Sequence, residues 1–158
     1  MVKLGLISDT HGLVRPEALE ALRGSELILH AGDVGSADVL EALRKVAPVR
    51  AVRGNNDRGA WARKLPQRRM LRVGSALVCL LHDLKDLGSG PRRPDIVLVV
   101  SGHSHRPVVR EEGGVVFVNP GSAGPRRFSL PISVARCEVV GKRVRARLVQ
   151  IPSRRISR

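Results

Sequence analysis

Aromatic side chains are almost absent from this chain of 158 residues. It contains no tyrosine, one tryptophan (Trp61) and two phenylalanines, Phe117 and Phe128. Proteins that bind single-stranded nucleic acids stack successive bases on aromatic rings, and three scattered rings do not make such a surface. We therefore do not favour a function that depends on base stacking.

Long apolar runs and clustered cysteines are also missing. No run approaches the roughly 20 apolar residues of a membrane-spanning helix. The apolar segment 1–9 is too short for the core of a secretory signal and contains an acid, so we interpret it as a strand and expect a cytoplasmic protein without a membrane partner. Cys79 and Cys137 lie in apolar stretches without CxxC spacing, which favours buried thiols in a reducing compartment over a disulfide.

Acidic residues are scarce relative to basic ones. Fourteen acids stand against 28 lysines and arginines, which gives a formal net charge of +14. One explanation is a face that binds nucleic acid or another anion, and the other is an arginine-rich surface with ion pairs. We favour the second explanation because the basic residues are spread along the chain, so nucleic acid is a less favoured partner.

Apolar runs separated by turn signals predict a single domain over residues 1–152 and a basic C-terminal tail at 153–158. Helices are expected over 16–23 and 36–45, a polar loop or short helix over 58–66, and a connection rich in Gly and Pro over 84–94. Strands are expected over 2–8, 26–31, 48–53, 68–73, 75–81, 95–100, 107–112, 115–118, 132–140 and 143–151. Because strands and helices alternate early and hairpins dominate late, the pattern indicates an α/β fold with mixed sheets.

Side chains able to bind a metal ion or a phosphate follow five of these strands. They are Asp9, His11, Asp33, Asn55, His82, His103 and His105. In α/β sheets ligands collect beyond the carboxyl ends of the strands, so these side chains converge if the strands lie side by side. His103 and His105 have i, i+2 spacing after an apolar strand, which in an extended chain places both rings on one side.

The number and type of these side chains favour two metal ions over one. A closed tetrahedral zinc site uses four ligands, whereas seven candidates serve two ions with four ligands each if Asp33 is shared. Imidazole, carboxylate and amide ligands together suit Mn, Fe, Ni, Co or Zn better than Mg or Ca. Two such ions with two carboxylates and a hydroxide keep a small positive charge, which suits an anionic phosphodiester.

The ordered motifs resemble those of the calcineurin-like metallophosphoesterases, in particular their small bacterial and archaeal phosphodiesterase branch. The resemblance rests on Asp9-x-His11, Gly32-Asp33, Gly54-Asn55, His82, Gly102-His103-x-His105 and Asn119-Pro120-Gly121-Ser122. It implies a four-layer αββα sandwich with two mixed β-sheets and a dinuclear metal site at the strand C-terminal ends. It also implies that Asp9, His11, Asp33 and His105 hold one ion, and that Asp33, Asn55, His82 and His103 hold the other. Manganese is the ion we expect first.

The same resemblance implies a function. It predicts a phosphoric diester hydrolase in which a metal-bridging hydroxide attacks phosphorus in a small-molecule phosphodiester, with Asp33, Asn55 and His103 as catalytic residues. Two alternatives stay open: a non-catalytic interaction scaffold like the retromer subunit of this fold, and a nuclease. A homodimer or homotetramer is compatible with the family, and the sequence does not choose between oligomeric states.

Two positions depart from the family pattern. Larger phosphatases of the superfamily place a general-acid histidine where this chain has Asn56, so Asp57 has no histidine to orient and we expect activated aryl diesters to react better than alkyl monoesters. Asp83 stands where glycine is common, and we expect it to alter the backbone or to accept a hydrogen bond from a ligand histidine. His30 is interpreted as a buried supporting residue, and segment 119–122 as a turn or as a source of backbone N–H groups for substrate.

Overall fold

The protein is described by a computed structural model over residues 1–88, 95–127 and 129–152. Ten strands form two sheets: β1 (Val2–Ile7), β2 (Leu27–His30), β3 (Val49–Ala51), β4 (Arg68–Val73), β5 (Ala76–Leu81), β6 (Ile96–Val100), β7 (Val108–Glu112), β8 (Val115–Asn119), β9 (Ser133–Val140) and β10 (Arg143–Gln150). Each strand boundary lies within two residues of the sequence prediction.

The first sheet has the order β10-β9-β1-β2-β3, and the second has the order β4-β5-β6-β8-β7. In the first sheet β1, β2 and β3 run parallel, while β9 is antiparallel to β1 and to β10. In the second sheet β5, β6 and β8 run parallel, and β4 and β7 are antiparallel edge strands. Both sheets are therefore mixed, which confirms the predicted fold class.

Apolar side chains fill the space between the two sheets. Leu4, Leu6, Leu29, Val78 and Leu98 belong to this core, and each is almost completely buried. Strand β6 is buried along its whole length, because its remaining side chains pack on the outer side of the second sheet. A strand buried on both faces reads as an uninterrupted apolar run, which is the pattern that predicted it.

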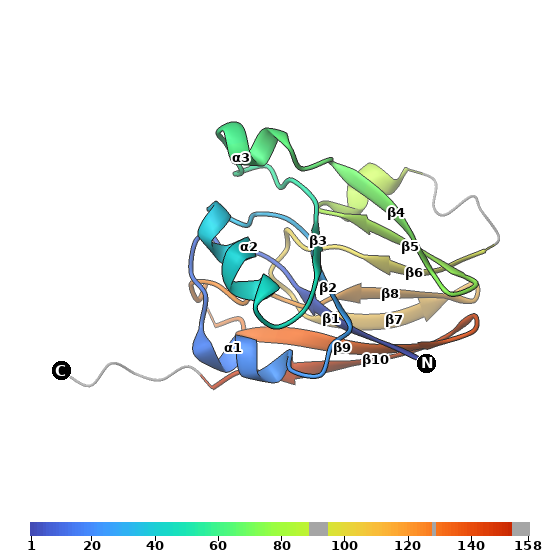
Figure 1. The fold of residues 1–158 in the computed structure, drawn as a ribbon. Coiled ribbons are helices and arrows are strands. Elements are labelled where there is room, and N and C mark those ends of the chain that lie inside the picture. Colours follow the sequence, from blue (N-terminus) through green and yellow to red (C-terminus); the bar gives the residue numbers. More distant parts are fainter. Residues whose placement is uncertain (89–94, 128, 153–158) are drawn as a thin grey trace.

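Helices cover the first sheet more fully than the second. Helices α1 (Pro16–Ala21) and α2 (Ala37–Arg44) lie against the outer face of the first sheet (Figure 1), where Leu22, Leu43 and Ile28 belong to one buried apolar cluster. The short α3 (Ala60–Arg63) lies in the predicted loop or helix 58–66. On the outer face of the second sheet, the described residues provide one turn of 3-10 helix, η1 (Leu84–Leu87), so this outermost layer of the sandwich is thin.

Several sequence expectations concern the termini, the connections and the cysteines. Cys79 and Cys137 are buried free thiols, as predicted. None of the helices in the described ranges is long and apolar enough to cross a membrane. The predicted basic tail 153–158 and the part of the 84–94 connection at 89–94 lie outside the described residues.

Candidate metal centre

The loops that follow β1, β2, β3, β5 and β6 meet at one end of the sandwich. The loop after β1 is hydrogen-bonded to the loop after β2, since Asp9 N donates to Gly32 O (3.0 Å) and His11 N donates to Asp33 O (2.9 Å). The two loops of the second sheet are joined by Gly102 N, which donates to His82 O (2.8 Å). The parallel order of the strands therefore brings the predicted side chains to one place.

Five of the seven candidate ligands have a left-handed backbone. Their φ angles are 55° at Asp9, 47° at His11, 54° at Asp33, 71° at His103 and 62° at His105. No other non-glycine residue with positive φ occurs in the described ranges. A left-handed conformation costs a residue with a Cβ about 1–2 kcal/mol, and such residues cluster where function requires a special geometry.

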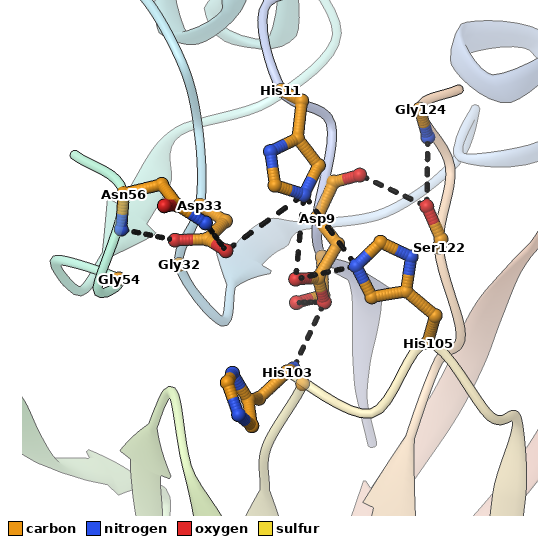
Figure 2. A network of polar contacts seen from close by, with 12 residues as sticks. Asp9, His11, Gly32, Asp33, Gly54, Asn56, His103, His105, Ser122 and Gly124 are labelled. Atoms are coloured by element: carbon orange, nitrogen blue, oxygen red, sulfur yellow. Dashed lines mark hydrogen bonds and ion pairs between the residues drawn. The ribbon is translucent and has the colours of Figure 1, made fainter. Parts of the chain in front are cut away.

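One group of acceptor atoms surrounds His11 Nε2. This nitrogen lies 3.4 Å from His105 Nε2, 3.9 Å from Asp9 Oδ1 and 3.7 Å from Asp33 Oδ2. Figure 2 shows the His11 and His105 rings pointing at the Asp9 carboxylate, with Asp33 on the far side of His11. Asp9 Oδ1 is buried and, beside the contact with His105 Nε2 at 3.3 Å, accepts no hydrogen bond from a described residue. Carboxylate oxygens and imidazole nitrogens gathered in this way fit a divalent cation.

A second group forms around His82, which is buried. Its Nδ1 donates to Ala31 O (2.7 Å), because a carbonyl oxygen only accepts. Its Nε2 therefore points at two further acceptors, Asn55 Oδ1 at 2.9 Å and Asp33 Oδ2 at 3.4 Å. Three acceptors facing one another require a proton or a metal ion between them, and a backbone carbonyl on the remote ring nitrogen is the arrangement found in metal-binding histidines.

Asp33 Oδ2 lies between the two groups. It is within 4 Å of both His11 Nε2 and His82 Nε2, and Asn56 Nδ2 donates to it at 3.0 Å. The other oxygen of the same carboxylate accepts from Asn56 N at 2.9 Å. This position fits a carboxylate shared by two ions.

His103 differs from the sequence expectation in its geometry. It was expected to continue an extended strand with its ring on the same side as that of His105, and that geometry is wrong, because both residues lie after the end of β6 with positive φ. The His105 side chain is buried, whereas 46% of the His103 side chain is exposed. The His103 ring lies edge-on to His82 with centroids 5.2 Å apart, and its Nε2 is 3.8 Å from Asp83 Oδ2.

The electrostatics of the centre favour ionised carboxylates. Burial alone raises the pKa of Asp9 and of Asp33, but hydrogen bonds outweigh it in both cases. His105 and Ser8 hold the pKa of Asp9 below its usual value, and His82 and Asn56 hold the pKa of Asp33 well below its usual range. Burial lowers the pKa of His82, yet the hydrogen bond with Asp33 and the Asp9 charge raise it above the ordinary histidine value.

Residues that are not candidate ligands connect the loops of the centre. Thr10 Oγ1 lies 3.0 Å from His30 Nε2, so the interpretation of His30 as a buried supporting residue agrees with the structure. Asp57 accepts backbone N–H groups from both Gly54 (2.8 Å) and Gly35 (2.9 Å), and so joins the loops after β2 and β3.

Segment 119–122 connects loops rather than facing outward. Asn119 Nδ2 donates to Gly102 O (3.0 Å), and Ser122 Oγ donates to Asp9 O (3.0 Å). The Gly121 N–H donates to Asn119 Oδ1 (2.9 Å) and the Ala123 N–H to Ser8 O (3.1 Å). The structure therefore favours the reading of this segment as a structural turn.

Known proteins share this sequence pattern and fold. Residues 2–142 match the sequence model of the calcineurin-like phosphoesterase superfamily domain. A probable metallophosphoesterase of Methanothermobacter thermautotrophicus is 36% identical over 159 aligned residues, which cover 93% of this chain and 91% of that protein. The chain also resembles a crystal structure described as a novel archaeal phosphodiesterase, with a TM-score of 0.78, 22% identity and coverage of 94% and 100% of the two chains. Vps29 of Entamoeba histolytica in complex with zinc has a TM-score of 0.72, 23% identity and coverage of 94% and 99%.

Proposed function

This chain belongs to the calcineurin-like phosphoesterase superfamily, and we propose that it is a phosphodiesterase that depends on two divalent metal ions. The observation that carries the proposal is the buried Asp9 Oδ1, which forms no well-aligned hydrogen bond within the described ranges and faces His105 Nε2 at 3.3 Å and His11 Nε2 at 3.9 Å. A buried carboxylate oxygen without a well-aligned donor is costly, and a cation bound among these atoms would remove that cost.

Each candidate ligand has a role in this proposal. Asp9, His11, Asp33 and His105 would hold one ion, and Asp33, Asn55, His82 and His103 the other. Two divalent ions in this place would supply a nucleophile from water at neutral pH and offset the negative charge that grows on phosphorus. Asp33 would fix the spacing of the two sites, because Asn56 holds both of its oxygens.

A preference for activated leaving groups follows from the residue beside the centre. Asn56 is the residue where larger relatives have a general acid, and its side chain donates to Asp33 instead of facing a leaving group. An amide does not supply a proton at useful pKa, so the leaving group must depart as a stable anion. Activated aryl diesters meet this requirement, and alkyl monoesters do not.

The test is metal-dependent hydrolysis by protein stripped of metal with a chelator. A chromogenic aryl diester and the matching monoester are assayed after addition of Mn²⁺, Ni²⁺, Co²⁺, Zn²⁺ or Mg²⁺. We expect Mn²⁺ to restore the highest diesterase activity and Asp33→Asn to remove it, with Asp38→Asn, an exposed acid in α2, as the matched control. No rate above background with any ion, or an active Asp33→Asn variant, would contradict the proposal.

Assays on the same protein distinguish the proposed phosphodiesterase from two other functions. A non-catalytic scaffold of this fold would bind no substrate and would be inactive with every ion, although it could still bind metal. A nuclease would cleave DNA or RNA, and its activity would fall steeply with salt because binding releases counterions from the phosphates. A cytoplasmic location, a single domain over residues 1–152 and a homodimer or homotetramer stay predictions.

A further inference from the structure

A hollow of about 410 Å³ lies beside the candidate metal centre, on the outer side of the second sheet. Its walls are the start of η1, the loop 101–106, the edge strand β7 and its neighbour β8. This volume falls within the range of small-ligand sites in proteins, roughly 300–1,000 Å³. The proposed chemistry does not use the hollow, so it needs an explanation of its own.

The hollow and the metal centre share a wall that is one segment of chain thick. Gly102 and His103 line the hollow, and on the other side His103 N donates to Asp9 Oδ2 at 3.0 Å. Gly102 is in such close contact that a Cβ there would overlap Ser8 Oγ and lie 2.6 Å from Asp9 Oδ2. A phosphate held at the centre would therefore have one of its ester groups next to the hollow.

Apolar side chains form most of the surface inside. Leu84, Val108 and Phe117 line the hollow, and Val108 is 41% exposed although it is large and apolar. The Arg110 guanidinium lies 4.2 Å from the centroid of the Phe117 ring. The Arg110 side chain is 44% exposed and pairs with Glu112, and an exposed guanidinium readily stacks on an aromatic ring.

Positive charge predominates at the rim. Lys85 and Arg106 are exposed and form no ion pair within the described ranges, whereas Asp83 is the one acid that lines the hollow there. The positive rim therefore favours a substrate that carries an anionic phosphate next to the hollow over a neutral or cationic one.

We propose that this hollow binds the ester arm of the substrate that is not cleaved, and that the arm is a flat aromatic group of about nucleoside size. The inference rests on the proposed function, because it names the substrate class of the same centre. The ring would lie on Arg110 and against Val108, while the phosphate lies at the metal ligands. A substrate of this class is a small phosphodiester with one nucleoside-like arm.

The first test measures binding and does not require turnover. Calorimetry compares thymidine 5′-monophosphate with methyl phosphate, using protein with and without added Mn²⁺. We expect the nucleotide to bind about 5- to 150-fold more tightly, since stacking of one base on a flat side chain contributes about 1–3 kcal/mol. Equal affinities for the two phosphates would overturn the inference.

Two neighbouring residues of β7 provide a matched pair of variants. Val108→Glu places a carboxylate in the hollow, whereas Val109→Glu places it on the opposite face of the same strand, because successive side chains alternate. Both valines are about equally exposed, at 41% and 40%. Val108→Glu should remove most of the preference for the nucleotide and Val109→Glu should keep it, so equal behaviour of the two variants would overturn the inference. Arg110→Ala, in an exposed position, decides the question if Val108→Glu does not fold.

The second test separates this inference from the proposed function. Two diesters with the same p-nitrophenyl leaving group are compared, one with a thymidine arm and one with a methyl arm. If the protein hydrolyses neither diester with any ion but the nucleotide preference still depends on Val108, the proposed function fails, and what stands of the inference is that the hollow binds a nucleoside-like group. If it hydrolyses both diesters with equal kcat/KM, and Val108→Glu changes neither rate, the proposed function stands and the inference fails.

Discussion

The carboxylate of Asp83 faces His103, with Oδ2 and Nε2 3.8 Å apart. The other oxygen, Oδ1, accepts a hydrogen bond from Lys85 N at 3.0 Å and caps η1. Asp83 therefore holds a fixed position between the first turn of η1 and His103, an exposed candidate ligand. A carboxylate on one ring nitrogen of a metal-binding histidine orients the ring and strengthens the other nitrogen as a ligand. The sequence suggested an acceptor for a ligand histidine, and the structure places the Asp83 carboxylate opposite His103 at a distance longer than a hydrogen bond.

Replacing Asp83 by asparagine should weaken the binding of one of the two metal ions. Asparagine keeps a cap for Lys85 N but loses the charge that faces His103, and changes of this kind reduce metal affinity by about 10–100-fold. Calorimetric titration of the stripped protein with Mn²⁺ or Zn²⁺ measures the two affinities separately. Asp86→Asn, an exposed acid in the same turn, is the control. Two unchanged affinities in Asp83→Asn would show that the contact has no part in metal binding.

The buried His30 should make the metal-free protein sensitive to mild acid. Gly32 N donates to His30 Nδ1 at 3.1 Å, so the ring proton is on Nε2 and points at Thr10 Oγ1, which in turn donates to Val34 O. Burial lowers the pKa of His30 from 6.5 to about 4, because the charged form loses its hydration. Between these values the unfolded chain binds a proton that the folded chain does not bind, and stability falls as the pH falls.

The expected loss from His30 is on the order of 3 kcal/mol of unfolding free energy between pH 6.5 and pH 4. Urea denaturation at several pH values measures it, and the difference between wild type and His30→Gln isolates it from other groups. Asp9 and Asp33 reduce stability only as the pH falls below this window, since their pKa values in the folded chain are depressed. His82 has a raised pKa in the folded chain, so its contribution to stability is lost as the pH rises above 6.5. A His30→Gln variant with an unchanged acid sensitivity would exclude this account.

Much of the architecture was predictable because the strands carry strong local signals. The run from Ile96 to Val100 is apolar throughout and buried throughout, and the turns at Gly74, Gly113 and Gly141 separate the paired strands as expected. The convergence of the loops also followed from the rule for parallel strands.

Contacts between loops were not predictable in the same way. Asp57 appeared to lack a purpose because its histidine neighbour is missing, yet it joins the loops after β2 and β3 through backbone N–H groups. The left-handed φ of His103 likewise depends on the hydrogen bond from its N–H to Asp9, which comes from a distant part of the chain. No local pattern of residues contains either relationship.

The leaving group should control the rate strongly. Asn56 Nδ2 donates to Asp33, and no histidine occupies that position to protonate a departing alkoxide. We therefore expect rates for a series of aryl diesters to decrease steeply as the pKa of the leaving phenol increases. Asn56→His should make this dependence shallower, and Asn56→Ala should leave it steep. A shallow dependence in the wild type would show that another residue supplies the proton.

The narrow space beside Asp33 gives a prediction on stability. A Cβ at Gly54 would overlap the backbone N and the Oδ1 of Asp33, which are held in place by the loops of the centre. Gly54→Ala must push these loops apart, and overpacking of this kind costs about 1–3 kcal/mol, in addition to any loss of metal binding. Gly74→Ala is the matched control, since a Cβ there meets no atom within 4 Å and the only expected cost is about 1–2 kcal/mol for its left-handed φ of 59°.

Urea denaturation with and without Mn²⁺ distinguishes the two variants. Gly54→Ala should lower stability more than Gly74→Ala and should gain less stability from added Mn²⁺, because displaced Asp33 no longer faces both His11 and His82. Gly74→Ala lies in the β4–β5 turn and should keep the full metal-dependent gain. An equal gain in both variants would mean that the position of Asp33 does not determine metal affinity, and that the two groups of ligands act independently of the carboxylate between them.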